Sequence, residues 1–100
     1  MKVNVQSVNF TADGKLIDFI QNRMDKLDVF YDRVIDSNVY LKVENTSSKE
    51  NKIVEIKVHV PKDKYVVKKQ CKSFEEAVDI ACSSLERKLV KRKEKQRLFA

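Results

Sequence analysis

The chain has 100 residues, of which 42% are hydrophobic and 36% are charged, and its formal net charge is +6. This balance excludes a disordered polymer and predicts one globular domain over residues 1–100, long enough for a modest core without disulfides or metals. No apolar run approaches about 18 residues, so no membrane-spanning helix is predicted. Residues 1–6 lack the apolar core of a signal peptide and alternate as a short strand does. We therefore expect a cytosolic protein.

An amphipathic helix follows this first strand. Thr11 or Asp13 can cap its start, and the helix is expected to run to about Tyr31. Apolar residues recur within it at three- and four-residue steps: Leu16, Ile17, Ile20, Met24, Leu27 and Tyr31. Arg23 and Lys26 flank this stripe on one side, so both side chains are expected to point the same way out of the protein.

Three further strands are predicted in the middle of the chain. Residues 35–45 and 54–60 each alternate, with apolar side chains on one face, and a polar turn over 46–51 joins them. A tight turn at 61–64 leads into residues 65–71, whose lysines are typical of an edge strand. Because each long strand has one apolar face, the sheet should be covered by helices on one side only.

The last quarter of the chain is predicted to be one long helix with two different halves. Ser73 and Glu76 have the spacing of a capping box. An apolar stripe follows: Phe74, Ala77, Val78, Ala81, Cys82, Leu85 and Leu89. Residues 86–97 then carry seven Lys and Arg against two Glu, a net charge of +5, whereas the rest of the chain carries +1. We expect the first half to pack on the core and the second half to protrude as the working surface.

The predicted order is β-α-β-β-β-α, an α+β fold in which two helices pack on one face of a four-stranded sheet. A protruding basic helix end is typical of a surface that binds polyanions. At 100° per residue, four cations share one flank beside the apolar stripe: Arg87, Lys88, Lys91 and Lys95. Arg92 falls where the stripe would continue. The alternative is a solvated helix face that only keeps the protein soluble, but so many charges on one helix end favour polyanion binding.

The sequence gives no support for catalysis. His59 is the only histidine and lies on the outward face of a predicted strand, where a solvated side chain is expected. The single glycine argues against a phosphate-cradling loop, and no residues have the spacing of metal ligands. Cys71 and Cys82 are expected to be reduced structural thiols. We therefore expect no enzymatic activity, no catalytic residue, no cofactor, no metal and no small-molecule substrate.

Three stretches resemble the ribosome hibernation promoting factor and ribosome-associated inhibitor family: FYDR at 30–33, LKVE at 41–44 and LERKLVKRKEK at 85–95. The resemblance covers nearly the whole chain. The basic helix is its most specific part, and Arg23 with Lys26 also matches the first helix of the family. The chain departs from the family pattern in the last turn, at 61–64, and at the start of the last helix.

The resemblance implies a fold similar to the double-stranded RNA-binding domain. It also implies binding to RNA in the decoding region of the small ribosomal subunit, where such proteins exclude messenger and transfer RNA in stationary phase or stress. A monomer away from the ribosome is expected, without the second domain with which long-form members pair ribosomes. With the charge pattern, the resemblance predicts RNA-binding side chains at Arg23, Lys26, Arg87, Lys88, Lys91, Arg92, Lys93 and Lys95.

Two alternatives remain open at this stage. The domain could be a free-standing module that binds double-stranded RNA. It could instead be an adaptor whose basic helix docks an acidic protein. The sequence also leaves open whether the protein silences single ribosomes or helps them to dimerise.

Overall fold

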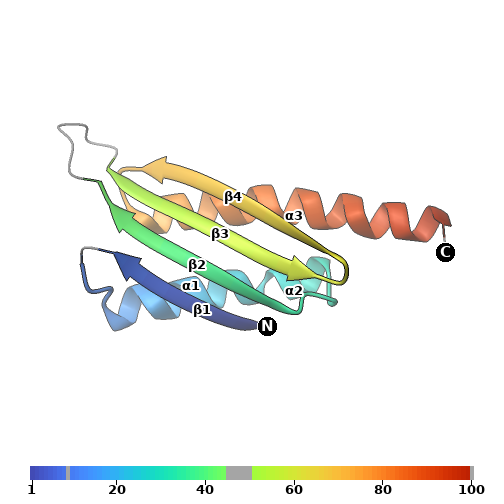
Figure 1. Cartoon of the computed structure of the whole chain (residues 1–100), viewed down its shortest axis with the longest axis horizontal. Coiled ribbons are helices and arrows are strands. Elements are labelled where there is room, and N and C mark those ends of the chain that lie inside the picture. Colours follow the sequence, from blue (N-terminus) through green and yellow to red (C-terminus); the bar gives the residue numbers. More distant parts are fainter. Residues whose placement is uncertain (9, 45–50, 100) are drawn as a thin grey trace.

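The computed structural model describes residues 1–8, 10–44 and 51–99, with side chains as far as Gln96. These described residues form four strands and three helices (Figure 1). In chain order they are β1 (Lys2–Val8), α1 (Gly14–Asp25), α2 (Leu27–Phe30), β2 (Asp36–Val43), β3 (Lys52–Val60), β4 (Asp63–Cys71) and α3 (Phe74–Phe99). The predicted order is confirmed, except that the first helix is divided at Lys26 into α1 and the single turn α2.

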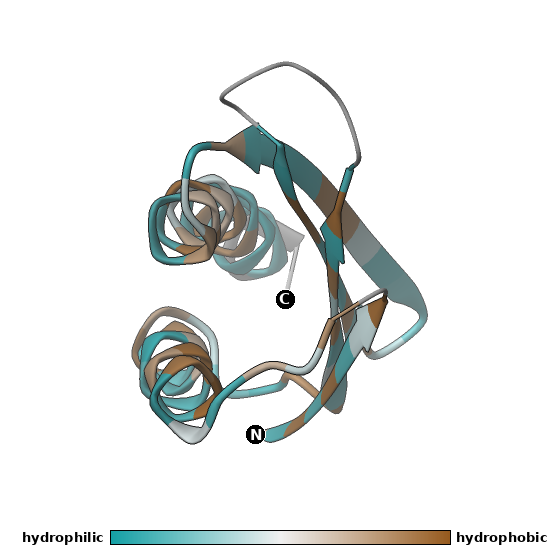
Figure 2. Cartoon of the chain, turned by 90° about the vertical axis from the view of Figure 1, so that its left-hand side faces the viewer, coloured by the Kyte–Doolittle hydropathy of each residue, from teal (hydrophilic) through white to brown (hydrophobic). Residues whose placement is uncertain are grey.

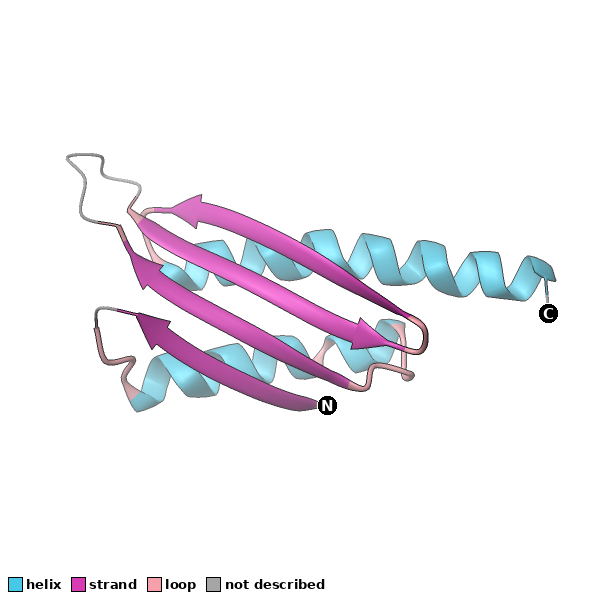
Figure 3. Cartoon of the chain, viewed as in Figure 1, coloured by secondary structure: helices cyan, strands magenta, loops and turns pink. Residues whose placement is uncertain are grey.

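The four strands form one mixed sheet in the spatial order β1-β2-β3-β4. β1 runs parallel to β2, and the remaining neighbours are antiparallel. β4 is an edge strand, as its lysines predicted. Figure 2 looks along the layers and shows the helices on one side of the sheet only, and Figure 3 shows them lying along that face. The prediction of a sheet covered on one side is therefore confirmed.

Local capping groups fix where the long helices begin. Asp13 rather than Thr11 caps α1, because its carboxylate accepts a hydrogen bond from the Leu16 amide at 2.8 Å. Ser73 caps α3, where its hydroxyl oxygen accepts from the Glu76 amide at 3.2 Å. Each bond satisfies one of the amides that the first turn of a helix leaves without a partner.

The core lies between the sheet and the helices. Among the described residues, the largest fully buried side chains are Ile20, Met24, Leu27, Leu41, Ile56, Leu85, Leu89, Val39, Val54, Val58, Val78 and Cys82. Ile17 was expected on the buried stripe but is 41% exposed, because it lies at the margin of the buried face of α1, whose centre is Ile20. In β4, Val67 faces the core, whereas Val66 is 43% exposed on the open face of the sheet. The two adjacent valines thus point to opposite faces, as strand geometry requires.

The predicted turn at 61–64 is a tight hairpin connection between β3 and β4, but it is shorter than expected, because Val60 pairs with Asp63 and only Pro61 and Lys62 lie between the strands. Lys62 adopts a backbone φ of 67°, in the left-handed region that residues other than glycine rarely occupy. The other predicted turn, at 46–51, lies almost wholly outside the described residues. None of the helices in the described part is both long and apolar enough to cross a membrane.

Candidate nucleic-acid interface

α3 supports the interface because its two halves have different surroundings. Leu85 and Leu89 are fully buried. No side chain from Val90 to Gln96 is buried, and the end of the helix projects past the end of the sheet (Figure 1). The projection contributes to an elongated shape of 49 × 24 × 19 Å. The predicted division of this helix into a packed half and a protruding half is confirmed.

The part of α3 from Arg87 onward carries five exposed cations: Arg87, Lys88, Lys91, Lys93 and Lys95. Lys26 is also exposed, at the junction of α1 and α2. None of these six side chains forms an ion pair with another residue in the described part of the chain. Their charges therefore remain available to a polyanion.

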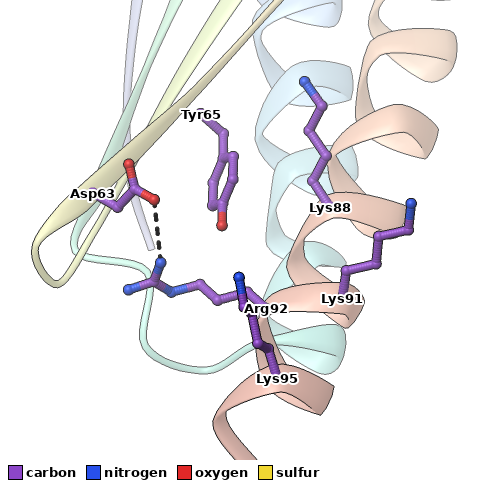
Figure 4. A pocket seen from close by; sticks show the side chains of 6 residues that line it. All are labelled: Asp63, Tyr65, Lys88, Lys91, Arg92 and Lys95. Carbon is purple, nitrogen blue, oxygen red and sulfur yellow. Dashed lines mark hydrogen bonds and ion pairs between the residues drawn. The ribbon is translucent and has the colours of Figure 1, made fainter.

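One flank of α3 and the edge strand β4 enclose a groove of about 320 Å³, which we call the lysine groove. It is lined by Asp63, Tyr65, Lys88, Lys91, Arg92 and Lys95. Figure 4 shows the three lysines rising from one flank of α3, with Tyr65 and Asp63 contributed by the strand opposite. The lining contains three lysines against one carboxylate, a composition that suits a chain of phosphates better than a single small molecule.

Arg92 also lines the groove, but its guanidinium binds other residues of the protein and is not available to a polyanion in the way that the three lysines are. Its guanidinium donates to the Pro61 carbonyl oxygen at 2.6 Å, to the Tyr31 hydroxyl at 3.2 Å and to the Asp63 carboxylate at 3.4 Å. Hydrogen bonds to Tyr31 and then Tyr65 raise the pKa of Arg92. These contacts, which we call the Arg92 latch, tie α3 to the β3–β4 turn and to the end of α2.

Arg23 is engaged in the same way at the other end of the helical layer. It donates to Asp79 at 2.8 Å, to Glu86 at 2.7 Å and to the Ser83 hydroxyl at 3.3 Å, all on α3. Burial lowers the pKa of Arg23, but hydrogen bonds to Asp79 and Glu86 more than offset this effect and raise it above the ordinary value. Its side chain is only 12% exposed. The expectation that Arg23 points outward beside Lys26 is therefore wrong, because acidic residues on α3 bind it.

A second groove, of about 410 Å³, lies between α2 and α3 on the other side of Lys91. Phe30 and Val90 line it together with Glu86, Arg87, Lys91 and Glu94. Phe30 was not among the side chains predicted to form the site. The available signal was its position next to Tyr31, since consecutive residues on a helix lie about 100° apart and only one of the two can lie at the centre of the buried face.

The remaining chemically distinctive groups lie elsewhere. His59 is half-exposed and not simply solvated, because its Nδ1 is hydrogen-bonded to the Asp36 carboxylate on the open face of the sheet. Cys71 and Cys82 are both buried, and neither is part of a disulfide. Burial raises the pKa of Cys82 to about 12, despite the opposing effect of Arg23. Within the described residues, no group of three or more His, Cys, Asp or Glu side chains could hold a metal ion.

Comparison with protein families and relatives gives one consistent result. A family model described as "Sigma 54 modulation protein / S30EA ribosomal protein" matches residues 3–97. A ribosome hibernation promoting factor from Azotobacter vinelandii is 27% identical over 96 residues, which cover 96% of this chain and 86% of the relative. One of the same description from Pseudomonas putida KT2440 is 26% identical over 96 residues, covering 96% and 90%.

Solved structures share the fold. The N-terminal domain of Thermus thermophilus Protein Y superposes with a TM-score of 0.79 at 20% identity, covering 91% of this chain and 98% of that one. A ribosomal subunit interface protein from Coxiella burnetii gives a TM-score of 0.82 at 17% identity, covering 94% and 99%. The mixed four-stranded sheet with its helices on one face is thus common to all three molecules.

Proposed function

Because the chain belongs to the Sigma 54 modulation protein / S30EA ribosomal protein family, we propose that it is a ribosome hibernation factor that binds ribosomes and holds them inactive. The names of its relatives support this role. The proposal depends most on the exposed cations of α3 from Arg87 to Lys95, none of which forms an ion pair within the described part of the chain. Such a surface binds a structured polyanion through phosphates held at fixed separations and needs no base-specific readout.

We further propose that the partner is the small ribosomal subunit and its RNA, and that the site is the decoding region. A folded body 49 × 24 × 19 Å in extent, with a radius of gyration of 14.2 Å, can obstruct a channel that is shaped for nucleic acid. Binding there blocks messenger RNA and transfer RNA by occupying their place. The protein would act in the cytoplasm, as a monomer away from the ribosome and without enzymatic activity.

The predicted RNA-binding residues divide into two roles in this proposal. The exposed side chains contact phosphates, and these are Lys26, Arg87, Lys88, Lys91, Lys93 and Lys95. Arg23 and Arg92 instead hold the frame that presents them, because their guanidinium groups already bind protein acceptors. Charge reversal at an exposed position should therefore weaken binding without loss of the fold.

Competition for purified small subunits tests channel occlusion directly. Excess initiator transfer RNA and messenger RNA, bound beforehand, should protect the subunits from the protein, and the protein bound first should exclude them. The double variant Lys91→Glu/Lys95→Glu should fold normally and fail to inhibit translation. Equal binding to vacant subunits and to preformed initiation complexes contradicts occlusion. Preferential binding to isolated duplex RNA over ribosomes would instead favour a free-standing RNA-binding module.

A further inference from the structure

The second groove, between α2 and α3, has a chemistry that the phosphate-binding row alone does not explain. We call it the Phe30 groove; it is lined by Phe30, Glu86, Arg87, Val90, Lys91 and Glu94. Its volume of about 410 Å³ lies within the range of pockets that hold small organic groups. An exposed aromatic ring beside two cations is unusual for a surface whose only task is solubility.

The fold forces Phe30 into this position. Leu27 is the first residue of α2 and Tyr31 follows its last; they are 0% and 3% exposed, and they anchor the turn to the core. The Tyr31 amide donates to the Leu27 carbonyl at 3.0 Å, which fixes the backbone between them. Phe30 is consequently left at the surface, 38% exposed, where it lines the groove together with Val90 of α3.

The electrostatics of the groove fit a nucleotide. Arg87 and Lys91 are exposed and unpaired within the described part of the chain, so each can bind a phosphate. Glu86 does not oppose them strongly, because its carboxylate is held by Arg23 at 2.7 Å. Glu94 is exposed and can accept a hydrogen bond from the amino group of a base. An aromatic face next to cations is the combination by which proteins bind unpaired bases.

We propose that the Phe30 groove takes one unpaired base of RNA, which stacks on Phe30 while its phosphate binds Arg87 and Lys91. The inference rests on the proposed function, since the RNA in question is that of the ribosome. This stacking contact requires an unpaired base, whereas the rest of the surface recognises only the charge and shape of the RNA. An aliphatic side chain of a ribosomal protein fits the groove less well, because cationic groups flank the ring.

The variant Phe30→Leu tests the stacking contact, since it keeps an apolar side chain and removes the ring. Val29→Ala is the matched control, because Val29 is the adjacent residue, 79% exposed, and does not line the groove. Both variants should melt close to the wild type. Phe30→Leu should weaken binding to purified ribosomes roughly 5- to 100-fold, the loss expected from one stacking contact. The slope of log affinity against log salt should stay unchanged, because no phosphate contact is lost.

A photoreactive p-benzoylphenylalanine at position 30 identifies the occupant on intact ribosomes. A cross-link to RNA supports the inference. A cross-link to ribosomal protein alone overturns it, as does an affinity of Phe30→Leu equal to that of Val29→Ala. Those results leave the proposed function standing if Lys91→Ala still weakens binding. If the wild-type protein does not co-sediment with ribosomes at all, the proposed function fails first and the inference fails with it.

Discussion

Replacing Arg92 with methionine removes the latch while it keeps most of the aliphatic stem. The guanidinium donates to a carbonyl at 2.6 Å, a hydroxyl at 3.2 Å and a carboxylate at 3.4 Å. A hydrogen bond from a charged donor contributes about 1.5–3 kcal/mol. The contact with Asp63, whose side chain is 52% exposed, adds little because water screens it. We therefore expect Arg92→Met to lower the free energy of unfolding by about 2 kcal/mol, or roughly 8–16 °C in melting temperature for a domain of this size.

The matched control is Lys91→Met, one residue earlier on the same helix and fully on the surface. It should change the free energy of unfolding by less than about 0.5 kcal/mol. Thermal melts followed by circular dichroism measure both variants. Ribosome binding then separates the two roles. Lys91→Met should reduce the slope of log affinity against log salt by about 1, because one phosphate contact is lost. Arg92→Met should weaken binding with the slope unchanged. If Arg92→Met melts like Lys91→Met and reduces the slope equally, Arg92 is a phosphate ligand and the latch argument is wrong.

Three further predictions follow from burial and charge. Leu85→Ala should lower stability by roughly 2–5 kcal/mol in urea titrations, because Leu85 is 0% exposed, and a near-neutral result would contradict the packing described for α3. With six exposed cations on phosphates, log affinity for small subunits should fall with log salt at a slope of about −5, and a flat response would indicate protein contacts instead. Cys82 should resist alkylation at pH 8 until the domain unfolds, because its pKa is raised to about 12. Rapid labelling of the native protein would contradict this. Since the folded state disfavours the Cys82 thiolate, the stability contributed by the protonated thiol should be complete below pH 9 and decrease between pH 9 and 12.

Short-range patterns made much of the fold predictable. The caps at Asp13 and Ser73 depend on a partner three residues away, and the alternation along β2 and β3 repeats every second residue. The stripe of α3, from Phe74 to Leu89, needs only the period of a helix. Each of these signals is contained within one element, so the sequence alone carries it.

The candidate site was less predictable because its decisive contacts are long-range. Arg23 and Arg92 look like surface cations in the sequence, but their acceptors lie 56 and 63 residues away for Arg23 and 29 to 61 for Arg92. Only the folded chain brings these groups together. Phe30 was missed although its signal is local, since the buried neighbours Leu27 and Tyr31 leave it at the surface. The exposed cations of α3 were predictable because no distant residue in the described part of the chain pairs with them; these are Arg87, Lys88, Lys91, Lys93 and Lys95.

The same row of charge has a consequence for the free protein. Arg87 and Lys91, Lys91 and Lys95, and Lys88 and Arg92 are like-charged pairs four residues apart on α3. Each such pair opposes helix formation by about 0.2–0.5 kcal/mol, although cations near the C-terminus are favoured by the helix dipole. Before it meets a polyanion, the end of α3 therefore carries an internal repulsion that counterions relieve. Added salt should accordingly make the isolated protein more helical over the same concentrations at which it releases RNA.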